Sequence, residues 1–240
     1  MAPLTLALKS TLALLMIDSI VELSLISSMV SWLHRRAGRD FIIDYNNTTF
    51  PLHGKPLNLL VDQGHTSNGA AGTAFVLIGL GGILALWLRN YKLGRPIYYF
   101  WLVMAQLSML LTLAALIYTF VLTREHEGHA IDIALAASLD NKPYPNMVPY
   151  PMDKWTPELW FSAVLELSLR ERSDRSDIRG HLRVMKGWRW NLIPMFILGL
   201  AVAVLAVMEA FVRRRQVSGR DEMAREAEKK ISDSTDTARN

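Results

Sequence analysis

Four long apolar runs dominate this 240-residue chain and constrain its fold more than any other feature. They cover residues 11–32, 70–88, 97–122 and 191–212, so each contains at least 19 residues. At about 1.5 Å of helical rise per residue, each run is long enough to cross a hydrocarbon core about 30 Å thick. A mean hydropathy of +0.18 agrees with this pattern. The sequence therefore excludes an ordinary soluble enzyme, a disulfide-built secreted domain and a disordered protein.

The predicted fold class is an all-α membrane protein with four transmembrane helices and a small extracytosolic subdomain formed by the loops. The first run is expected to stay as a span, because acidic residues interrupt its apolar start and no Ala-x-Ala-like cleavage site follows. In chain order, the predicted organisation is an N-terminal tail (1–10), span one (11–33), outer loop one (34–69), span two (70–88), an inner link (89–96), span three (97–122), outer loop two (123–189), span four (190–212) and a partly disordered C-terminal tail (213–240).

Outer loop one contains two segments with β-strand character, Phe41–Tyr45 and Pro56–Asp62, separated by residues typical of turns. This pattern predicts a short hairpin outside the membrane. Either Ser67 or Asn68 is expected to cap the helix of span two.

Outer loop two is expected to begin as a helical continuation of span three, up to about Leu139. The segment 141–157 contains five prolines and is predicted to be extended and irregular. A helix should then begin with Thr156 as its N-cap and Pro157 in its first turn, and continue to about Arg172. Its nearly continuous apolar surface suits a helix that lies on the membrane or docks under loop one.

Basic residues next to the spans favour cytosolic termini and place both large loops outside. Two overlapping Asn-x-Thr sequons, at Asn46 and Asn47, point the same way as sites of glycosylation in loop one. The net charge of +4 is attributed to contacts with anionic lipid head groups rather than with nucleic acid. The basic residues predicted to face lipid are Arg183, Lys186, Arg189, Arg213, Arg214 and Arg215.

Two acidic residues in span one are the sharpest candidates for chemistry. Asp18 and Glu22 lie four residues apart and share one helix face, which should point at protein or water because a charge in mid-bilayer is costly. Without a cation at matching depth, at least one of the two carboxyls is expected to carry a proton. Gln106 of span three lies at about the same depth. The pair is either a proton- or cation-responsive site or a hydrogen-bonded structural pair.

Small residues predict the faces on which helices pack closely. They are Gly72, Gly79 and Gly82 in span two and Gly199, Ala203, Ala206 and Ala210 in span four. These faces suit packing within one bundle or self-association.

The His126-Glu127-Gly128-His129 sequence resembles a metal-binding pattern, but its histidines are three residues apart and not four. We interpret these residues mainly as a solvated helix end, and no metal or other cofactor is predicted. The absence of cysteine excludes Cys-ligated zinc and iron–sulfur clusters.

Two sequence blocks, residues 155–160 and 181–194, resemble a poorly characterised family of four-span membrane proteins of filamentous ascomycete fungi. This resemblance implies a multi-pass topology and no particular activity. The layout of two large outer loops and one tight inner link is also similar to that of claudin-like proteins. Their loop-one motif of tryptophan and paired cysteines is missing here, so their barrier and sensing roles do not carry over.

The leading function hypothesis is a non-enzymatic organiser, adaptor or accessory subunit in a plasma or internal membrane. Its partners would be the lipid bilayer and a membrane protein, or further copies of itself. One alternative is a small oligomeric channel or transporter-like protein that uses Asp18, Glu22 and Gln106. A second alternative is a membrane-embedded enzyme built on His126 and His129.

Overall fold

The computed structural model describes residues 2–36, 39–57, 59–91, 94–139, 142–143 and 154–237, and it is 78% helical. Four helical segments are long and apolar enough to cross a membrane, which confirms the predicted fold class. The elements in chain order are α1 (Ala2–Arg36), β1 (Asp40–Tyr45), β2 (Thr48–His53), α2 (Asp62–Gly72), the π-helix η1 (Thr73–Leu80), α3 (Gly81–Leu88), α4 (Gly94–Glu125), α5 (Ile133–Ser138), α6 (Pro157–Glu166) and α7 (Arg172–Thr237).

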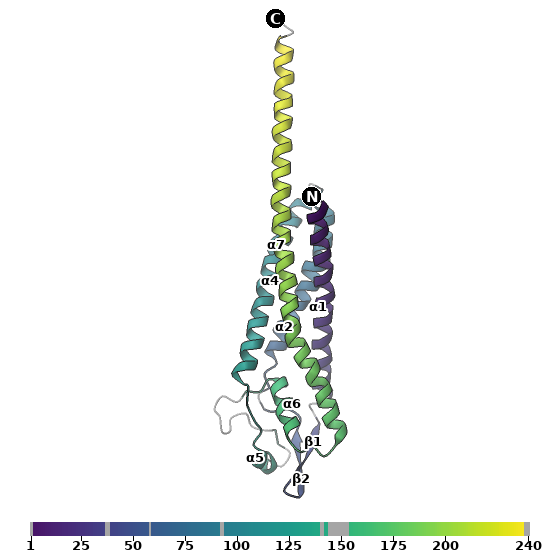
Figure 1. Cartoon of the computed structure of the whole chain (residues 1–240), viewed down its shortest axis with the longest axis vertical. Coiled ribbons are helices and arrows are strands. Elements are labelled where there is room, and N and C mark those ends of the chain that lie inside the picture. Colours follow the sequence, from purple (N-terminus) through teal and green to yellow (C-terminus); the bar gives the residue numbers. More distant parts are fainter. Residues whose placement is uncertain are drawn as a thin grey trace.

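The long helices form an elongated bundle with a small subdomain at one end (Figure 1). The segment from α2 to α3 acts as one span, and α1, α4 and α7 supply the others. The hairpin, α5 and α6 gather at the end opposite the N-terminus, whereas α7 projects far beyond the bundle at the N-terminal end. Both large loops therefore lie at one end of the bundle, as four antiparallel spans require.

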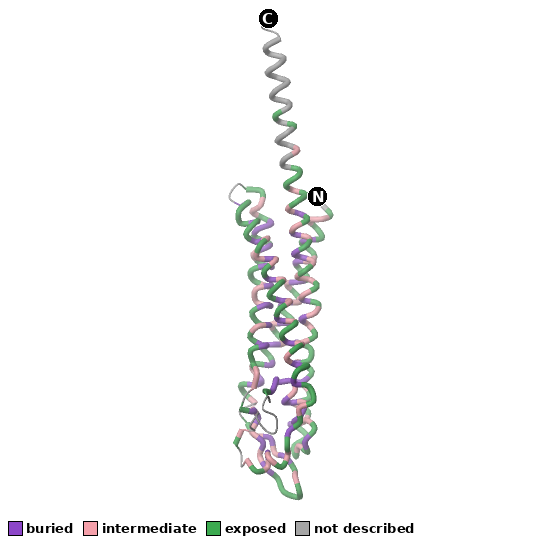
Figure 2. Tube along the Cα trace, turned by 90° about the vertical axis from the view of Figure 1, so that its left-hand side faces the viewer, coloured by how far each residue is buried: buried purple, intermediate pink, exposed green. Residues whose placement is uncertain are grey.

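The outward faces of the bundle are apolar. Large side chains such as Ile83, Phe100, Val103 and Ile197 are more than half exposed. Figure 2 shows the resulting alternation of exposed and buried positions along each helix. Because a continuous apolar surface of this kind is unfavourable in water, the surroundings that it fits are lipid chains.

Small and aromatic residues fill the interior between the helices. Ala70, Ala74 and Ala85 are buried on the second span, and Trp101 of α4 packs beside them in the same cluster. The indole of Trp101 donates a hydrogen bond to the carbonyl of Ile78 over 3.0 Å, inside the wider turns of η1. This bond fixes the Trp101 ring against the second span.

The subdomain at the loop end of the bundle, named the outer subdomain after its predicted side of the membrane, has its own hydrophobic core. Phe41 and Ile43 of β1 pack with Trp160 and Phe161 of α6 and with Met185 of α7, and each of these five side chains is fully buried. Backbone bonds join the two loops as well: Asp44 N–H donates to the carbonyl of Ser168, and Arg170 N–H donates to that of Ile42. The two loops therefore fold as one unit.

The observed hairpin differs from the prediction in its second strand. β1 pairs antiparallel with β2 at Thr48–His53, and not with Pro56–Asp62. The two residues between the strands, Asn46 and Asn47, both have positive φ angles, of 49° and 58°. Such angles define the two-residue turn that joins tight hairpins, and asparagine tolerates them better than most residues. The turn therefore sets the register and determines where β2 begins.

Two further predictions about helix ends are wrong. The second span begins at Asp62, so Ser67 and Asn68 lie inside the helix and do not cap it. Span three ends at Glu125 and does not continue to Leu139, because Gly128 turns the chain with a φ of 87°. A separate short helix then begins, with the Asp132 side chain accepting bonds from two of its backbone N–H groups.

The helix start at Thr156 is confirmed. The Thr156 hydroxyl accepts a bond from Leu159 N–H, and Pro157 occupies the first turn. The helix ends earlier than predicted, at Glu166, where Arg175 donates to the carbonyls of Leu165 and Leu167. Most of the proline-rich segment 141–157 lies outside the described residues.

The last helix is longer than predicted. α7 begins at Arg172, before span four, and continues to Thr237 in the segment expected to be partly disordered. The only proline within it is Pro194, near the start of the apolar run. Residues of high helix propensity, alanine, glutamate, lysine and arginine, fill much of the region after Arg213 and account for its helical backbone.

The close contact at Gly82 predicts opposite outcomes for two glycine-to-alanine substitutions. A methyl group at position 82 would lie 2.9 Å from the Trp101 ring, whereas one at Gly72 would meet nothing within 4 Å. We expect Gly82→Ala to destabilise the bundle by about 1–3 kcal/mol through overpacking. Gly72→Ala should be neutral or stabilise by up to about 1 kcal/mol. Thermal unfolding followed by tryptophan fluorescence in detergent measures both, and a higher midpoint for Gly82→Ala than for Gly72→Ala would contradict the packing.

Candidate functional site

The two acidic residues of α1 differ in their surroundings. Glu22 is completely buried, and its Oε2 accepts a hydrogen bond from the Asn191 amide of α7 over 3.0 Å. Asp18, one turn earlier, is only partly buried. One oxygen of each carboxylate is buried without a hydrogen-bond partner. Within the described residues, neither carboxylate forms a salt bridge. The structure thus places one acid in a contact between α1 and α7.

Gln106 does not complete this site. Its amide donates over 3.2 Å to the carbonyl of Ala203 on α7. Two hydroxyl groups on the same helix also bond elsewhere: Thr11 donates to the carbonyl of Ala7, and Ser19 to that of Leu15. Asn191, which the sequence placed at the edge of span four, is the partner that Glu22 finds.

A second polar cluster lies near the end of the bundle at which α3 is joined to α4. It was not predicted from the sequence. Glu209 of α7 is 3% exposed and forms a salt bridge with Arg89, at the end of α3. Its other carboxylate oxygen accepts a hydrogen bond from the hydroxyl of Tyr98 in α4. Arg213 adds a bond to the carbonyl of Arg89 over 2.7 Å. These contacts join the inner link to α7.

The small residues fall into two groups. Gly79 and Gly82 face neighbouring helices closely, since an added Cβ would meet Met16 or Trp101 within 3 Å. Ala203 and Ala206 are buried, and Ala210 packs beside them in the inner core. Gly72 and Gly199 have open space where a Cβ would stand. Only part of each predicted seam is therefore in close helix contact.

The predicted lipid-facing basic residues also divide. Arg183, Lys186, Arg214 and Arg215 are exposed. Arg189 is not a free surface residue, because it forms a 3.1 Å salt bridge with Glu158 of α6 and lies over the rings of Phe120 and Trp190. The prediction for Arg189 is wrong because α6 folds against α7 and brings the Glu158 carboxylate to the outer end of span four.

Opposing effects act on the pKa of Glu158. Burial raises the pKa of Glu158, the cations Arg189 and Lys186 oppose this rise, and Glu127 adds to it. A cavity of about 390 Å³ separates these groups from the end of α4. The salt bridge therefore stabilises the carboxylate less than burial destabilises it.

The histidine pair of loop two does not form a metal site. The rings of His126 and His129 lie edge to face, with centroids 5.5 Å apart. In the described part of the chain, no cluster of three or more histidine, aspartate or glutamate side chains could hold a metal ion. The turn at Gly128 breaks the helix that would have aligned His126, His129 and Asp132 on one face.

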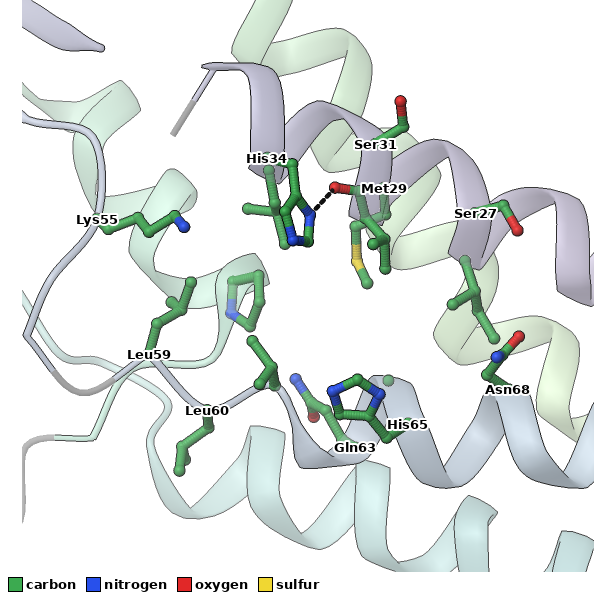
Figure 3. Close-up of a pocket in the computed structure, with 16 residues that line it drawn as sticks. Ser27, Met29, Ser31, His34, Lys55, Leu59, Leu60, Gln63, His65 and Asn68 are labelled. Atoms are coloured by element: carbon green, nitrogen blue, oxygen red, sulfur yellow. Dashed lines mark hydrogen bonds between the residues drawn. The ribbon is translucent and has the colours of Figure 1, made fainter. Parts of the chain in front are cut away.

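A larger cavity, of about 620 Å³, lies at the outer end between α1, the chain before α2 and α2 itself. Its walls are mostly apolar and include Ile26, Met29 and Leu59. Figure 3 shows His34 of α1 opposite Gln63 and His65 of α2, with Lys55 at a third side. The volume falls within the range of about 300–1,000 Å³ that is typical of small-molecule sites. Sequence patterns could not identify this site, because its walls come from three separate segments.

The two sequon asparagines are both exposed at the tip of the hairpin. Comparison with protein-family models, with curated proteins and with solved structures finds no match. The resemblance to fungal four-span proteins therefore stays a prediction, and the arguments that follow rest on the geometry of this chain.

Replacement of Glu158 tests the electrostatics of the outer subdomain. Because its pKa is raised in the folded state, proton binding favours folding, and this stabilisation is lost as the pH rises from the ordinary value of 4.5 through the folded-state pKa. Glu158→Gln should match the wild type near about pH 4 and be the more stable chain near about pH 8. The difference in stability should be roughly 1.4 kcal/mol for each pH unit by which the folded-state pKa of Glu158 exceeds its ordinary value. Thermal midpoints across this range provide the measurement. The exposed Glu166→Gln is the matched control, and a Glu158→Gln chain that loses stability at high pH would contradict the assignment.

Proposed function

We propose that this chain is a non-enzymatic membrane organiser, acting as an adaptor or accessory subunit. The observation that carries the proposal is the continuity of α7 from Arg172 to Thr237. One helix supports the outer subdomain, forms part of the bundle and projects beyond it. Such a helix can hold a partner on one side of the membrane in a fixed position relative to the subdomain on the other side.

The outer end of α7 supports this role because it is tied to α1. The Trp32 indole donates to Asp177 over 2.9 Å and stacks on His181, with ring centroids 4.5 Å apart. Arg36 forms salt bridges with Asp174 and Asp177. These contacts make the first turns of α7 part of a rigid outer platform.

The other end of α7 is suited to binding a partner. Residues 213–237 continue the helix for about 37 Å, at about 1.5 Å per residue. Met223 within this extension is 64% exposed. Most helical stability in proteins comes from tertiary packing, so packing against another protein would stabilise this extension. We place this extension and the basic residues Arg213, Arg214 and Arg215 in the cytosol, and the hairpin with Asn46 and Asn47 on the outer side.

The acidic pair has a structural role in this proposal. The bond between Glu22 and Asn191 links α1 to α7, so it fixes how the two helices pair. The transport alternative would need a polar path past Glu22, which is completely buried in the single chain. That alternative therefore requires an oligomer.

A matched pair of substitutions at Gly219 tests the organiser proposal. Gly219 lies in the extension with open space around it, so Gly219→Ala should keep the helix and Gly219→Pro should break it at a cost of about 3 kcal/mol. The chain should be extracted from its native membrane in mild detergent and its particle mass and subunit composition measured. We expect wild type and Gly219→Ala to exceed the 27.1 kDa monomer by a partner in fixed ratio, and Gly219→Pro to lose that partner. A monomer in every case, or equal retention by both variants, would contradict the proposal.

A further inference from the structure

We propose that the outer cavity of about 620 Å³ binds a single-chain lipid whose head group carries both a phosphate and a hydroxyl, as in a lysophosphatidic acid. The cavity is lined in part by exposed side chains, since Val30 and Val61 are 37% and 42% exposed. It lies where the last turns of α1 meet the start of α2, and we assign this level to the head-group region of the bilayer.

The apolar part of the cavity fits an acyl chain. Ile26, Met29 and Leu33 of α1 face Leu59 and Leu60 across it. These side chains offer no hydrogen bonds, so burying a hydrocarbon chain among them is favourable through the hydrophobic effect. A fully polar ligand would lose its hydration there and gain nothing in return.

The polar rim fits an anion. Lys55 supplies a full positive charge and, among the described residues, has no ion-pair partner. His34 and His65 lie on opposite sides of the hollow (Figure 3). The Nδ1–H of His34 donates to the carbonyl of Val30 over 2.8 Å, so Nε2 can donate to a phosphate only in the protonated ring. Among the described residues that line the cavity none is acidic, so a phosphate would meet Lys55 without a competing carboxylate.

Gln63 is the residue that selects for a hydroxyl on the lipid head group. This side chain lines the cavity and is 2% exposed, and its Oε1 is buried without a hydrogen-bond partner. Leaving a buried acceptor unsatisfied is unfavourable. A turn of the Gln63 amide would bring the enclosed Oε1 to the cavity, where a donor on the ligand would satisfy it. A fully ionised phosphate has no hydrogen to donate, whereas a glycerol hydroxyl has one. The combination of Lys55 and Gln63 therefore selects a hydroxyl-bearing phospholipid over a fatty acid.

Binding to the purified full chain in detergent micelles tests the assignment. The probes, all of matched chain length, are lysophosphatidic acid, a fatty acid, an alkyl phosphate without a hydroxyl, and lysophosphatidylcholine, whose choline cation would oppose Lys55. We expect one lysophosphatidic acid per chain by native mass spectrometry, bound at least about tenfold more tightly than the other three. Equal binding of all four probes would show nonspecific partition into an apolar groove and overturn the proposal.

Two substitutions separate the two parts of the head group. Lys55→Gln should weaken lysophosphatidic acid and the alkyl phosphate about tenfold or more, whereas Lys154→Gln, on the exposed surface of the same end, should bind as the wild type does. Gln63→Leu should weaken lysophosphatidic acid while leaving the alkyl phosphate unchanged. Unfolding midpoints confirm that each variant is folded. Unchanged affinity in Lys55→Gln, or equal weakening of both probes in Gln63→Leu, would overturn the assignment.

Discussion

The lack of water inside a lipid bilayer is the constraint on which the rest of this structure depends. Backbone groups are satisfied within helices, and a buried polar side chain is costly unless it finds a partner in the protein. Three such contacts converge on α7: Asn191 donates to Glu22 of α1, Ala203 accepts from Gln106 of α4, and Glu209 bonds to Arg89 and Tyr98. α7 is therefore the helix to which the other spans are attached by specific polar bonds.

A different kind of interaction, hydrophobic packing, holds the first turns of α7 in the outer subdomain. Its core is aromatic and dry, with Trp160 and Phe161 of α6 packed against β1 and the first turns of α7. Arg175 closes the end of α6, and Trp32 and Arg36 attach the end of α1. Hydrophobic packing in the subdomain and polar bonds between the spans thus act on one continuous element. This continuity supports the organising role that we propose.

The sequence could predict what depends on local pattern and length. The four apolar runs and the cap at Thr156 belong to this group, because a span or a helix start is encoded within a few turns of chain. The sequence also contains a two-residue hairpin signal at Asn46-Asn47, but the predicted turn covered the whole interval between the two β segments, so the second strand was placed too late. Contacts between residues distant in the sequence could not be predicted. Glu209 and Arg89 are 120 residues apart, and the walls of the outer cavity come from three segments, so only folding brings them together.

The continuity of α7 can be measured directly because the chain has no cysteine. Spin labels at Arg183→Cys and Arg215→Cys, both exposed positions on α7, would report the distance across the span in lipid nanodiscs. The 32 residues between them correspond to about 48 Å at about 1.5 Å of rise per residue. A single narrow distribution near that distance is the predicted result. A broad or markedly shorter distribution would show that the helix breaks, for example at Pro194, and would contradict the coupling of the outer subdomain to the inner extension.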